Sequence, residues 1–208
     1  MNIFTALSVS LLAAYLIGSF PTSYIFARLF KGIDIRQHGS GNVGATNVVR
    51  TVGKVPGFIV LMIDIAKGVI AVTIVARYFY PFIAGMDFAA YRAMMGIAVI
   101  CGHVWTVFLK FKGGKGIATT LGVIFVISPL ALAASCVVWL ACFIITSYVS
   151  LSSILLVVSC PIFAAILGEP IPVVLFTIIV CFITTYRHKP NITRLLDGTE
   201  SKLKLFSK

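Results

Sequence analysis

The amino-acid sequence predicts an all-α protein, a polytopic membrane bundle of seven transmembrane helices with its N-terminus outside and its C-terminus in the cytoplasm. Of its 208 residues, 60% are hydrophobic and only 11% are charged, whereas a soluble domain carries about a quarter charged residues. Apolar stretches of roughly 17 to 25 residues, long enough to cross a bilayer as a helix, fill most of the chain. No strand pattern or internal repeat is evident, and we expect one integral-membrane domain over residues 1–208.

The predicted helices follow one another with short polar breaks. The stretch 116–186 is almost continuously apolar and is broken at Ser128-Pro129, at 147–153 and at 168–170, where Pro, Ser and Gly mark helix ends or kinks. Pro129 can also merely kink one helix, which leaves the boundary between the fourth and fifth spans open. The predicted spans are residues 3–27, 56–78, 89–109, 116–133, 134–149, 152–168 and 171–186.

Basic residues set the predicted orientation. Segments 28–54, 110–115 and 187–208 contain most of the 17 Lys and Arg residues, and the positive-inside rule places all three in the cytoplasm. An even number of crossings must then separate the second segment from the third. Two crossings would give helices of about 35 residues, too long at 1.5 Å per residue for a ~30 Å core, whereas four crossings fit.

The distribution of charge and cysteine excludes several classes of protein. The net charge of +11 lies in short segments between apolar runs, without the basic patches of nucleic-acid-binding proteins, so we expect no nucleic-acid partner. The five cysteines lie in apolar stretches without a Cys-x-x-Cys pair, so we expect buried, inert thiols and neither a disulfide nor a metal site. The first twenty residues lack the Lys and Arg of a cleavable signal peptide and are interpreted as the first span.

Three predicted helices, the second, fourth and sixth, begin at the cytoplasmic face. Their unpaired N–H groups and positive dipole ends then point toward the polar segments, where an anion would be stabilised. Ser150 and Ser153 lie where the sixth helix begins. Each is a candidate to cap that helix and to share its end with an anion.

The first polar segment, SGNVGATNVVR at residues 40–50, has the composition of a phosphate cradle. Its glycines allow the backbone to approach a ligand, its Ser and Asn side chains donate hydrogen bonds, and its arginine presents a fork suited to phosphate oxygens. An ordinary interfacial turn uses the same residue types, so this segment alone leaves both interpretations open. The candidate phosphate-binding residues are Ser40, Gly41, Asn42, Gly44, Asn47 and Arg50.

The second polar segment, residues 102–116, contains KFKGGKG. A nucleotide P-loop is excluded because Leu109 replaces its first glycine and Gly116 its Ser or Thr. Two glycines between lysines instead offer backbone donors and cations, although the lysines can also be interfacial anchors, the interpretation we favour for Lys110. His103, near the cytoplasmic end of the third helix, has either a structural or a catalytic role. The candidate site residues are His103, Lys112, Gly113, Gly114 and Lys115.

The third polar segment, RHKPNITRL at residues 187–195, follows the last span. A basic tail of this kind often only binds anionic lipid head groups, and we interpret Lys202, Lys204 and Lys208 as solvated. Donors set directly at the membrane surface are the candidate site residues of this segment: His188, Asn191 and Arg194.

Asp64 and Lys67 lie three residues apart inside the second predicted helix, where charges are costly and usually paired or functional. A pair on one helix face explains both residues, although Lys67 could instead reach a phosphate.

Three anion-binding segments on one membrane face together predict a site that holds phosphate groups against a lipid-filled bundle.

These segments resemble the three cytoplasmic motifs of the bacterial acyl-phosphate-dependent glycerol-3-phosphate acyltransferases, the PlsY type. The resemblance covers essentially the whole chain in length, span number and motif order. The matching stretches are GSGNVGATNVVR at 39–50, GHVWTVFLKFKGGKGIAT at 102–119 and RHKPNITRLLDGTE at 187–200, with DIAKG at 64–68 and YVSLSS at 148–153.

The resemblance implies transfer of an acyl group from acyl phosphate to glycerol 3-phosphate, which gives lysophosphatidic acid and phosphate and begins phospholipid synthesis. It implies no cofactor, no metal, and neither acyl-CoA nor acyl carrier protein as direct donor. The implied partners are the two substrates, membrane lipid and, functionally, the enzyme that makes acyl phosphate. We expect a monomeric, multi-pass protein of the bacterial inner membrane whose active site faces the cytoplasm.

The resemblance implies that the residues in contact with substrate are Ser40, Arg50, Lys115, His188 and Asn191. All of these except Arg50 are candidate catalytic residues. The His-x4-Asp dyad of the other large class of glycerophosphate acyltransferases is absent, because a phenylalanine stands five positions after the histidine of the second segment. Since phosphate leaves readily, we expect catalysis by positioning and charge stabilisation, with a substrate phosphate oxygen or His188 accepting the hydroxyl proton.

Two other functions are compatible with a polar membrane face. A transporter of phosphate or of a phosphorylated metabolite also binds anions at helix ends, but its site usually lies near the midplane, often between repeated halves. A non-catalytic lipid-binding or assembly subunit would use the same residues only for association.

Overall fold

A computed structural model describes residues 2–83 and 85–203 of the chain. All regular secondary structure in these residues is helical, which confirms the predicted all-α class. The chain divides into two compact units, Met1–Ile127 and Ser128–Lys208, and each is described by itself. Lys204 and Lys208, interpreted from the sequence as solvated, lie outside the described residues.

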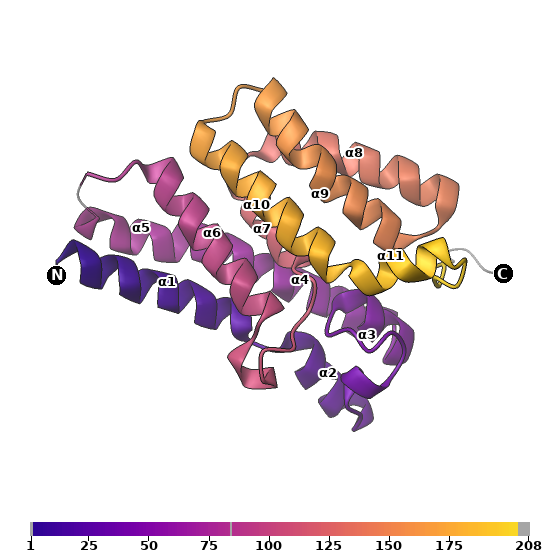
Figure 1. Cartoon of the computed structure of the whole chain (residues 1–208). Coiled ribbons are helices and arrows are strands. Elements are labelled where there is room, and N and C mark those ends of the chain that lie inside the picture. Colours follow the sequence, from indigo (N-terminus) through magenta and orange to yellow (C-terminus); the bar gives the residue numbers. More distant parts are fainter. Residues whose placement is uncertain (1, 84, 204–208) are drawn as a thin grey trace. The chain divides into compact units, whose positions relative to one another are not determined.

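The helices of the first unit are α1 Ile3–Ser19, α2 Thr22–Lys31, α3 Ala45–Thr51, α4 Lys54–Ile70, α5 Ala76–Phe79, α6 Phe88–Val104 and α7 Ile117–Ile127 (Figure 1). α1 packs against α6, and α4 packs against α7. Glycines allow the close approach of α1 and α6: a Cβ on Gly18 would overlap the Val99 carbonyl, and one on Gly102 would overlap the Tyr15 carbonyl. Small residues serve this purpose in membrane bundles, where helices gain little from burying apolar side chains.

Arg92, in the first unit, donates hydrogen bonds to backbone carbonyls of two other helical segments. After α4 the chain continues through a π-helical turn, Ala71–Val75, into α5. Arg92 of α6 donates to the carbonyl oxygen of Val72 in that turn (3.2 Å) and to that of Val126 in the last turn of α7 (3.0 Å). Backbone carbonyls at such irregularities need partners in an apolar bundle, so the guanidinium stabilises both.

The helices of the second unit are α8 Pro129–Thr146, α9 Val149–Ile166, α10 Ile171–Arg187 and α11 Lys189–Leu196 (Figure 1). α9 packs against both α8 and α10, and α11 is bent by 59° from α10. Beyond α11 the chain returns to the turn between α8 and α9. There Leu203 N–H donates to the Ser147 carbonyl (3.0 Å), and Lys202 Nζ lies 5.1 Å from the centre of the Tyr148 ring.

Five helical segments of the described residues are long and apolar enough to cross a membrane: Ile3–Lys31, Lys54–Phe82, Phe88–Leu109, Pro129–Thr146 and Val149–Ile166. The bent pair α10 and α11 gives a sixth if it counts as one span, whereas α7 is apolar but has only eleven residues. The multi-pass membrane class is therefore confirmed. The count of seven spans and the orientation of the termini stay predictions.

The predicted boundary between the fourth and fifth spans, at residues 133 and 134, is wrong. α7 ends at Ile127 and α8 begins at Pro129. A residue before proline is disfavoured in the α region, and proline itself suits the first turn of a helix, where its missing N–H is not needed. Ser128 accordingly leaves the helix (φ −147°, ψ 74°). The Ser-Pro pair thus marks a true helix start and not a kink.

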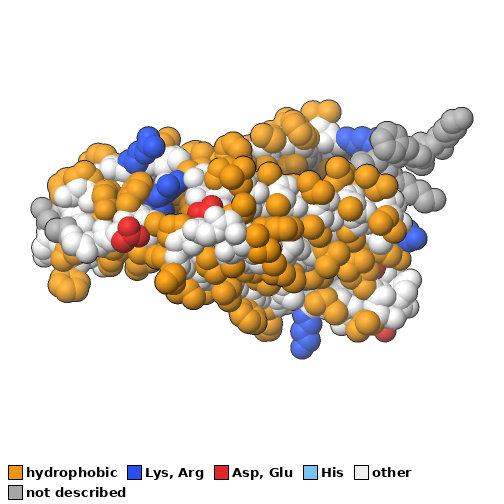
Figure 2. Space-filling view, turned by 90° about the horizontal axis from the view of Figure 1, so that it is seen from above, with side chains coloured by type: hydrophobic (Ala, Val, Ile, Leu, Met, Phe, Trp, Pro, Cys, Tyr) orange, Lys and Arg blue, Asp and Glu red, His pale blue; other side chains and the backbone are white. Residues whose placement is uncertain are grey.

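Hydrophobic side chains dominate the face seen in Figure 2, and charged side chains appear there only singly or in small groups. Large apolar residues such as Ile74, Ile145 and Phe182 are exposed, as expected for helices surrounded by lipid. All five cysteines are free thiols. The prediction that all of them are buried holds for Cys142 and Cys160. It is wrong for Cys136, which is exposed on α8, and Cys101 and Cys181 are only half-buried.

Candidate active site

Asn47 organises the first polar segment from within. The residue is buried, and its Nδ2 donates to the carbonyl oxygens of Ile35 (3.3 Å), His38 (3.0 Å) and Asn42 (3.0 Å). Its Oδ1 accepts from the backbone N–H of Ser40 (2.9 Å). The amide is thus engaged by the loop itself, and Asn47 shapes the segment that carries the other candidate residues.

The ends of this segment are more accessible. Gly41 has a positive φ of 70°, a conformation that glycine adopts without strain, and it turns the chain after Ser40. Gly44 is extended and immediately precedes α3. Ser40 and Arg50 are exposed, and Asn42 is half-buried. The polar side chains predicted to meet a phosphate therefore surround a loop whose interior is fixed by a neutral amide.

The second polar segment folds back onto the end of α6. Gly113 N–H donates to the Val104 carbonyl and Gly114 N–H to the His103 carbonyl, both at 3.1 Å. A Cβ on Gly113 would overlap the His103 carbonyl, and one on Gly114 would overlap the His103 ring. The glycines permit close packing, and their N–H groups hold the segment in place. This structural use was not anticipated from the sequence, which suggested donors for an anion.

The first two polar segments meet in the first unit. A Cβ on Gly114 would lie 2.6 Å from the Val43 carbonyl oxygen, so the two loops pack backbone to backbone. Val43, Gly113 and Gly114 line a common small pocket together with His103 and with residues of α4 and of the α1–α2 break. Lys112 is exposed and Lys115 half-buried at the end of the same segment.

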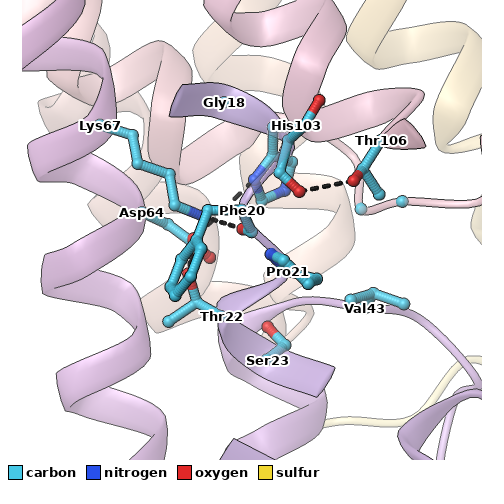
Figure 3. Close-up of a pocket in the computed structure, with 13 residues that line it drawn as sticks. Gly18, Phe20, Pro21, Thr22, Ser23, Val43, Asp64, Lys67, His103 and Thr106 are labelled. Carbon is cyan, nitrogen blue, oxygen red and sulfur yellow. Dashed lines mark hydrogen bonds and ion pairs between the residues drawn. The ribbon is translucent and has the colours of Figure 1, made fainter. Parts of the chain in front are cut away.

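A buried ion pair forms one wall of this pocket (Figure 3). Asp64 Oδ1 accepts from Lys67 Nζ at 2.6 Å and from Thr22 Oγ1 at 3.0 Å. Lys67 Nζ also donates to the Phe20 carbonyl at 2.5 Å, in the break between α1 and α2. The predicted pairing of Asp64 with Lys67 on one helix face is confirmed. His103 Nδ1 lies 3.9 Å from the same Asp64 oxygen.

Glu200 organises the third polar segment, in the second unit. Its Oε1 accepts from Ser150 Oγ and from Asn191 Nδ2, and its Oε2 accepts from Arg194 Nε, each at 2.7 Å. Burial by itself would raise the pKa of Glu200, but hydrogen bonds from these three residues outweigh it and lower the pKa below its ordinary value. The carboxylate is thus kept ionised by neutral and cationic donors.

Glu200 was not among the site residues predicted from the sequence. The only hint in the sequence was that Glu200 is one of six acidic residues in the chain and lies within a basic tail. Ser150 was expected to meet an external anion at the start of α9, and in this structure it donates to the carboxylate of Glu200 instead. Ser153, the other serine named there, is buried and accepts a long hydrogen bond from Trp139 Nε1 (3.5 Å).

His188 is buried at the junction of α10 and α11. Its Nδ1 lies 2.7 Å from the Thr184 carbonyl oxygen. A carbonyl can only accept, so Nδ1 carries the proton and Nε2 is the basic nitrogen of the neutral ring. Any proton transfer by this histidine would therefore use Nε2.

A family model described as glycerol-3-phosphate acyltransferase matches residues 8–198. The chain belongs to this family. It is 45% identical over 193 residues to a glycerol-3-phosphate acyltransferase of Desulforamulus reducens, covering 93% of each chain, and 44% identical over 195 residues to glycerol-3-phosphate acyltransferase 2 of Moorella thermoacetica, covering 94% of this chain and 96% of the relative.

Two solved structures of PlsY (YgiH), an integral membrane glycerol 3-phosphate acyltransferase, are similar to this member of the family. The glycerol 3-phosphate form has a TM-score of 0.86 at 39% identity, with 95% of this chain and 96% of that chain covered. The lysophosphatidic acid form has a TM-score of 0.83 at the same identity, with 95% of both chains covered.

The predicted site residues of this acyltransferase-family chain fall into two groups. In the first unit the loops of the first two segments pack together, with Ser40, Arg50, Lys112 and Lys115 near their accessible ends. In the second unit, donors of the third segment and of α9 meet at Glu200. Their union around one ligand stays a prediction. Among residues 2–83 and 85–203, no group of three His, Cys, Asp or Glu is arranged to hold a metal ion.

Proposed function

We propose that this protein transfers a fatty acyl group from acyl phosphate to a hydroxyl group of glycerol 3-phosphate and releases lysophosphatidic acid and phosphate. Membership of the glycerol-3-phosphate acyltransferase family carries this proposal. The similar PlsY structures in a glycerol 3-phosphate form and a lysophosphatidic acid form support the acceptor and the product. Acyl phosphate as donor rests on the resemblance of the three polar segments to the acyl-phosphate-dependent type.

In the proposed reaction, the bond between the acyl carbon and the phosphate oxygen breaks as the ester bond to glycerol forms. The hydroxyl proton passes to a substrate phosphate oxygen or to Nε2 of His188. Because phosphate is already a good leaving group, the chain contributes mainly by holding both substrates and by stabilising negative charge. No metal or cofactor takes part in this scheme.

The residues proposed to do this are those expected from the sequence. Ser40, His188, Asn191 and Lys115 are proposed catalytic residues that contact the reacting groups, and Arg50 is proposed to bind a phosphate as a bidentate partner. Asn47, Gly113 and Gly114 act by holding their segments in place. The remaining proposed contributors to phosphate binding are Gly41, Asn42, Gly44, His103, Lys112, Ser150, Ser153 and Arg194.

We further propose seven spans, with the N-terminus outside and the active site at the cytoplasmic face of the bacterial inner membrane. The five long apolar segments, the α10–α11 pair and the short apolar helix α7 together support this count. The protein is proposed to act as a monomer and as one domain over residues 1–208. It is proposed to receive its acyl phosphate from the enzyme that makes this donor.

The test is product formation by the purified protein in detergent, given palmitoyl phosphate with or without glycerol 3-phosphate. We expect lysophosphatidic acid only when both are present. A transporter would form none, because its function requires a sealed compartment. Arg50→Ala should lower kcat/KM by about a hundredfold, because a hydrogen bond to a charged group contributes about 1.5–3 kcal/mol and each ~1.4 kcal/mol is a factor of ten in rate. The matched control Arg77→Ala, at an exposed arginine of α5, should keep wild-type activity. Equal activity of both variants would remove Arg50 from the proposed phosphate site, whereas a non-catalytic subunit would form no product at all.

A further inference from the structure

The buried pair Asp64–Lys67 has no place in the proposed contacts to substrate. Both side chains are almost fully buried, with 1% and 5% of their surface exposed, inside a helix of the apolar bundle. Charges in such a position are costly and tend to be retained where they serve function. The pair therefore requires an explanation beyond the packing of α4.

The pair ties α4 to the break between α1 and α2. Thr22 Oγ1 donates to Asp64, and Lys67 donates to the Phe20 carbonyl (Figure 3). This break lies directly beside the pocket where the first two polar segments meet. Ser23, in the same wall, has a buried hydroxyl without a hydrogen-bond partner. The wall is thus polar and faces the loops, although the helices around it are apolar.

His103 connects the pair to the glycines of the second polar segment. On one side its Nδ1 lies 3.9 Å from Asp64 Oδ1. On the other side its Nε2 is packed so closely on Gly114 that a Cβ there would overlap it. The backbone carbonyl of His103 also accepts the Gly114 N–H (3.1 Å). The histidine thus lies between the ion pair and the backbone that leads into Lys115.

We propose that Asp64 and Lys67 are positioning residues for the acyl transfer: the pair holds His103 against Gly114 and so fixes the segment that carries Lys115. This inference rests on the proposed function for its effect on catalysis. A misplacement of about 1 Å in a catalytic group can lower the rate by about a hundredfold, so a support of this kind matters even though it lies away from the substrates.

The alternative is that the pair only stabilises the bundle, and a charge-free double variant separates the two. Replacing a buried ion pair by apolar residues of similar volume is often neutral or stabilising, whereas removing one partner is strongly destabilising. Asp64→Leu combined with Lys67→Met should therefore melt near the wild-type temperature, while Asp64→Leu alone should not. Arg92→Met removes another cation of the bundle, one that donates to backbone carbonyls away from the loops, and is the matched control.

Two readouts are measured on each purified variant in detergent. Hydrogen–deuterium exchange follows the peptide that covers residues 105–116, where the Gly113 and Gly114 amides donate to α6. Steady-state kinetics with palmitoyl phosphate and glycerol 3-phosphate give kcat/KM. In the double variant we expect exchange of this peptide to be at least tenfold faster and kcat/KM to be at least tenfold lower, at an unchanged melting temperature. Arg92→Met should lower the melting temperature and leave both readouts at their wild-type values.

Wild-type exchange and wild-type kcat/KM in the stable double variant would overturn the proposal. If the double variant does not fold, Thr22→Val provides the test, because it removes one donor to Asp64 without leaving a buried charge unpaired. Faster exchange at 105–116 and a threefold or larger drop in kcat/KM are then expected, and no change in either would overturn the proposal. If the wild-type protein forms no product, the proposed function fails, while exchange still decides whether the pair holds the segment.

Discussion

In the first unit a neutral amide, that of Asn47, holds the polar loop together, whereas in the second unit a carboxylate, that of Glu200, holds the polar segment. Asn47 both donates and accepts, so it joins backbone groups of its own loop. Glu200 only accepts, so it gathers side-chain donors: Asn191 and Arg194 lie nine and six residues earlier, and Ser150 lies fifty residues earlier. The central residue of the first region is neutral and its partners are local, whereas that of the second region is charged and also joins one residue that is distant in sequence.

The largest loss of stability is expected from removing the carboxylate of Glu200. Glu200→Ala leaves the buried hydroxyl of Ser150 without its acceptor, removes the hydrogen bond from Asn191 and breaks the ion pair with Arg194, which should cost about 3 kcal/mol. This corresponds to a melting temperature about 6–12 °C lower for a protein of this size. Glu200→Gln keeps one acceptor and should cost about half as much. A melting curve of Glu200→Ala that matches the wild type would contradict the assigned role of Glu200.

Removing the side-chain amide of Asn47 should give the next largest loss of stability. Asn47→Ala removes four hydrogen bonds within one loop, but backbone groups near the surface can regain water, so we expect about 2 kcal/mol. Product formation should fall with it, because Ser40 loses its support. Gln37→Ala, at a nearby exposed position, is the control and should stay within about 0.5 kcal/mol of the wild type. Equal melting temperatures for the two variants would remove Asn47 from the centre of the loop.

Lowering the pH should reveal the contribution of Glu200 to stability. The pKa of Glu200 is lowered in the folded protein from its ordinary value of 4.5. A carboxyl group with such a shift stabilises the fold at pH values above its unfolded pKa, and this contribution is lost as the pH falls through the folded pKa. The melting temperature of the wild type should therefore fall as the pH is lowered below about 4.5, and Glu200→Gln should show a smaller fall. Parallel pH profiles for the two proteins would rule out this linkage.

The smallest effect is expected from a charge at the edge of the first region. Arg36 pairs with Asp34 at 2.6 Å and lowers the pKa of that carboxyl to about 2. The pair lies at the surface, where ion pairs contribute little, so Arg36→Gln should cost no more than about 0.5 kcal/mol. Its kcat/KM should equal that of the wild type. A loss as large as that of Asn47→Ala would mean that charge matters in the first region as well.

The contrast between the regions also explains what the sequence could predict. Local patterns sufficed for the membrane class and for the Asp64–Lys67 pair, whose partners are three residues apart. They also named candidate residues in each polar segment, whose roles stay predictions. Glu200 escaped because its role depends on Ser150, and no local pattern brings those two positions together. Among the basic residues of the tail it resembled a solvated charge.

Gly113 and Gly114 show a different reason why a structural role was not predicted. Glycine is used both where a backbone must bend toward a ligand and where two backbones must touch, and the sequence is the same in both cases. Only the packed structure shows that His103 and Val43 occupy the space that a side chain would need. At Pro129 the opposite occurred, since the correct local signal was present but was weighed against a kink within one helix, and the boundary was placed a few residues later.

The most direct test of the central claim, that this chain joins an acyl group from acyl phosphate to glycerol 3-phosphate, is the ratio of the two products. Lysophosphatidic acid and inorganic phosphate are measured together from purified protein supplied with palmitoyl phosphate and glycerol 3-phosphate. The account predicts one phosphate for each lysophosphatidic acid at all times. Phosphate released at the same rate without glycerol 3-phosphate, or no lysophosphatidic acid at all, would contradict it.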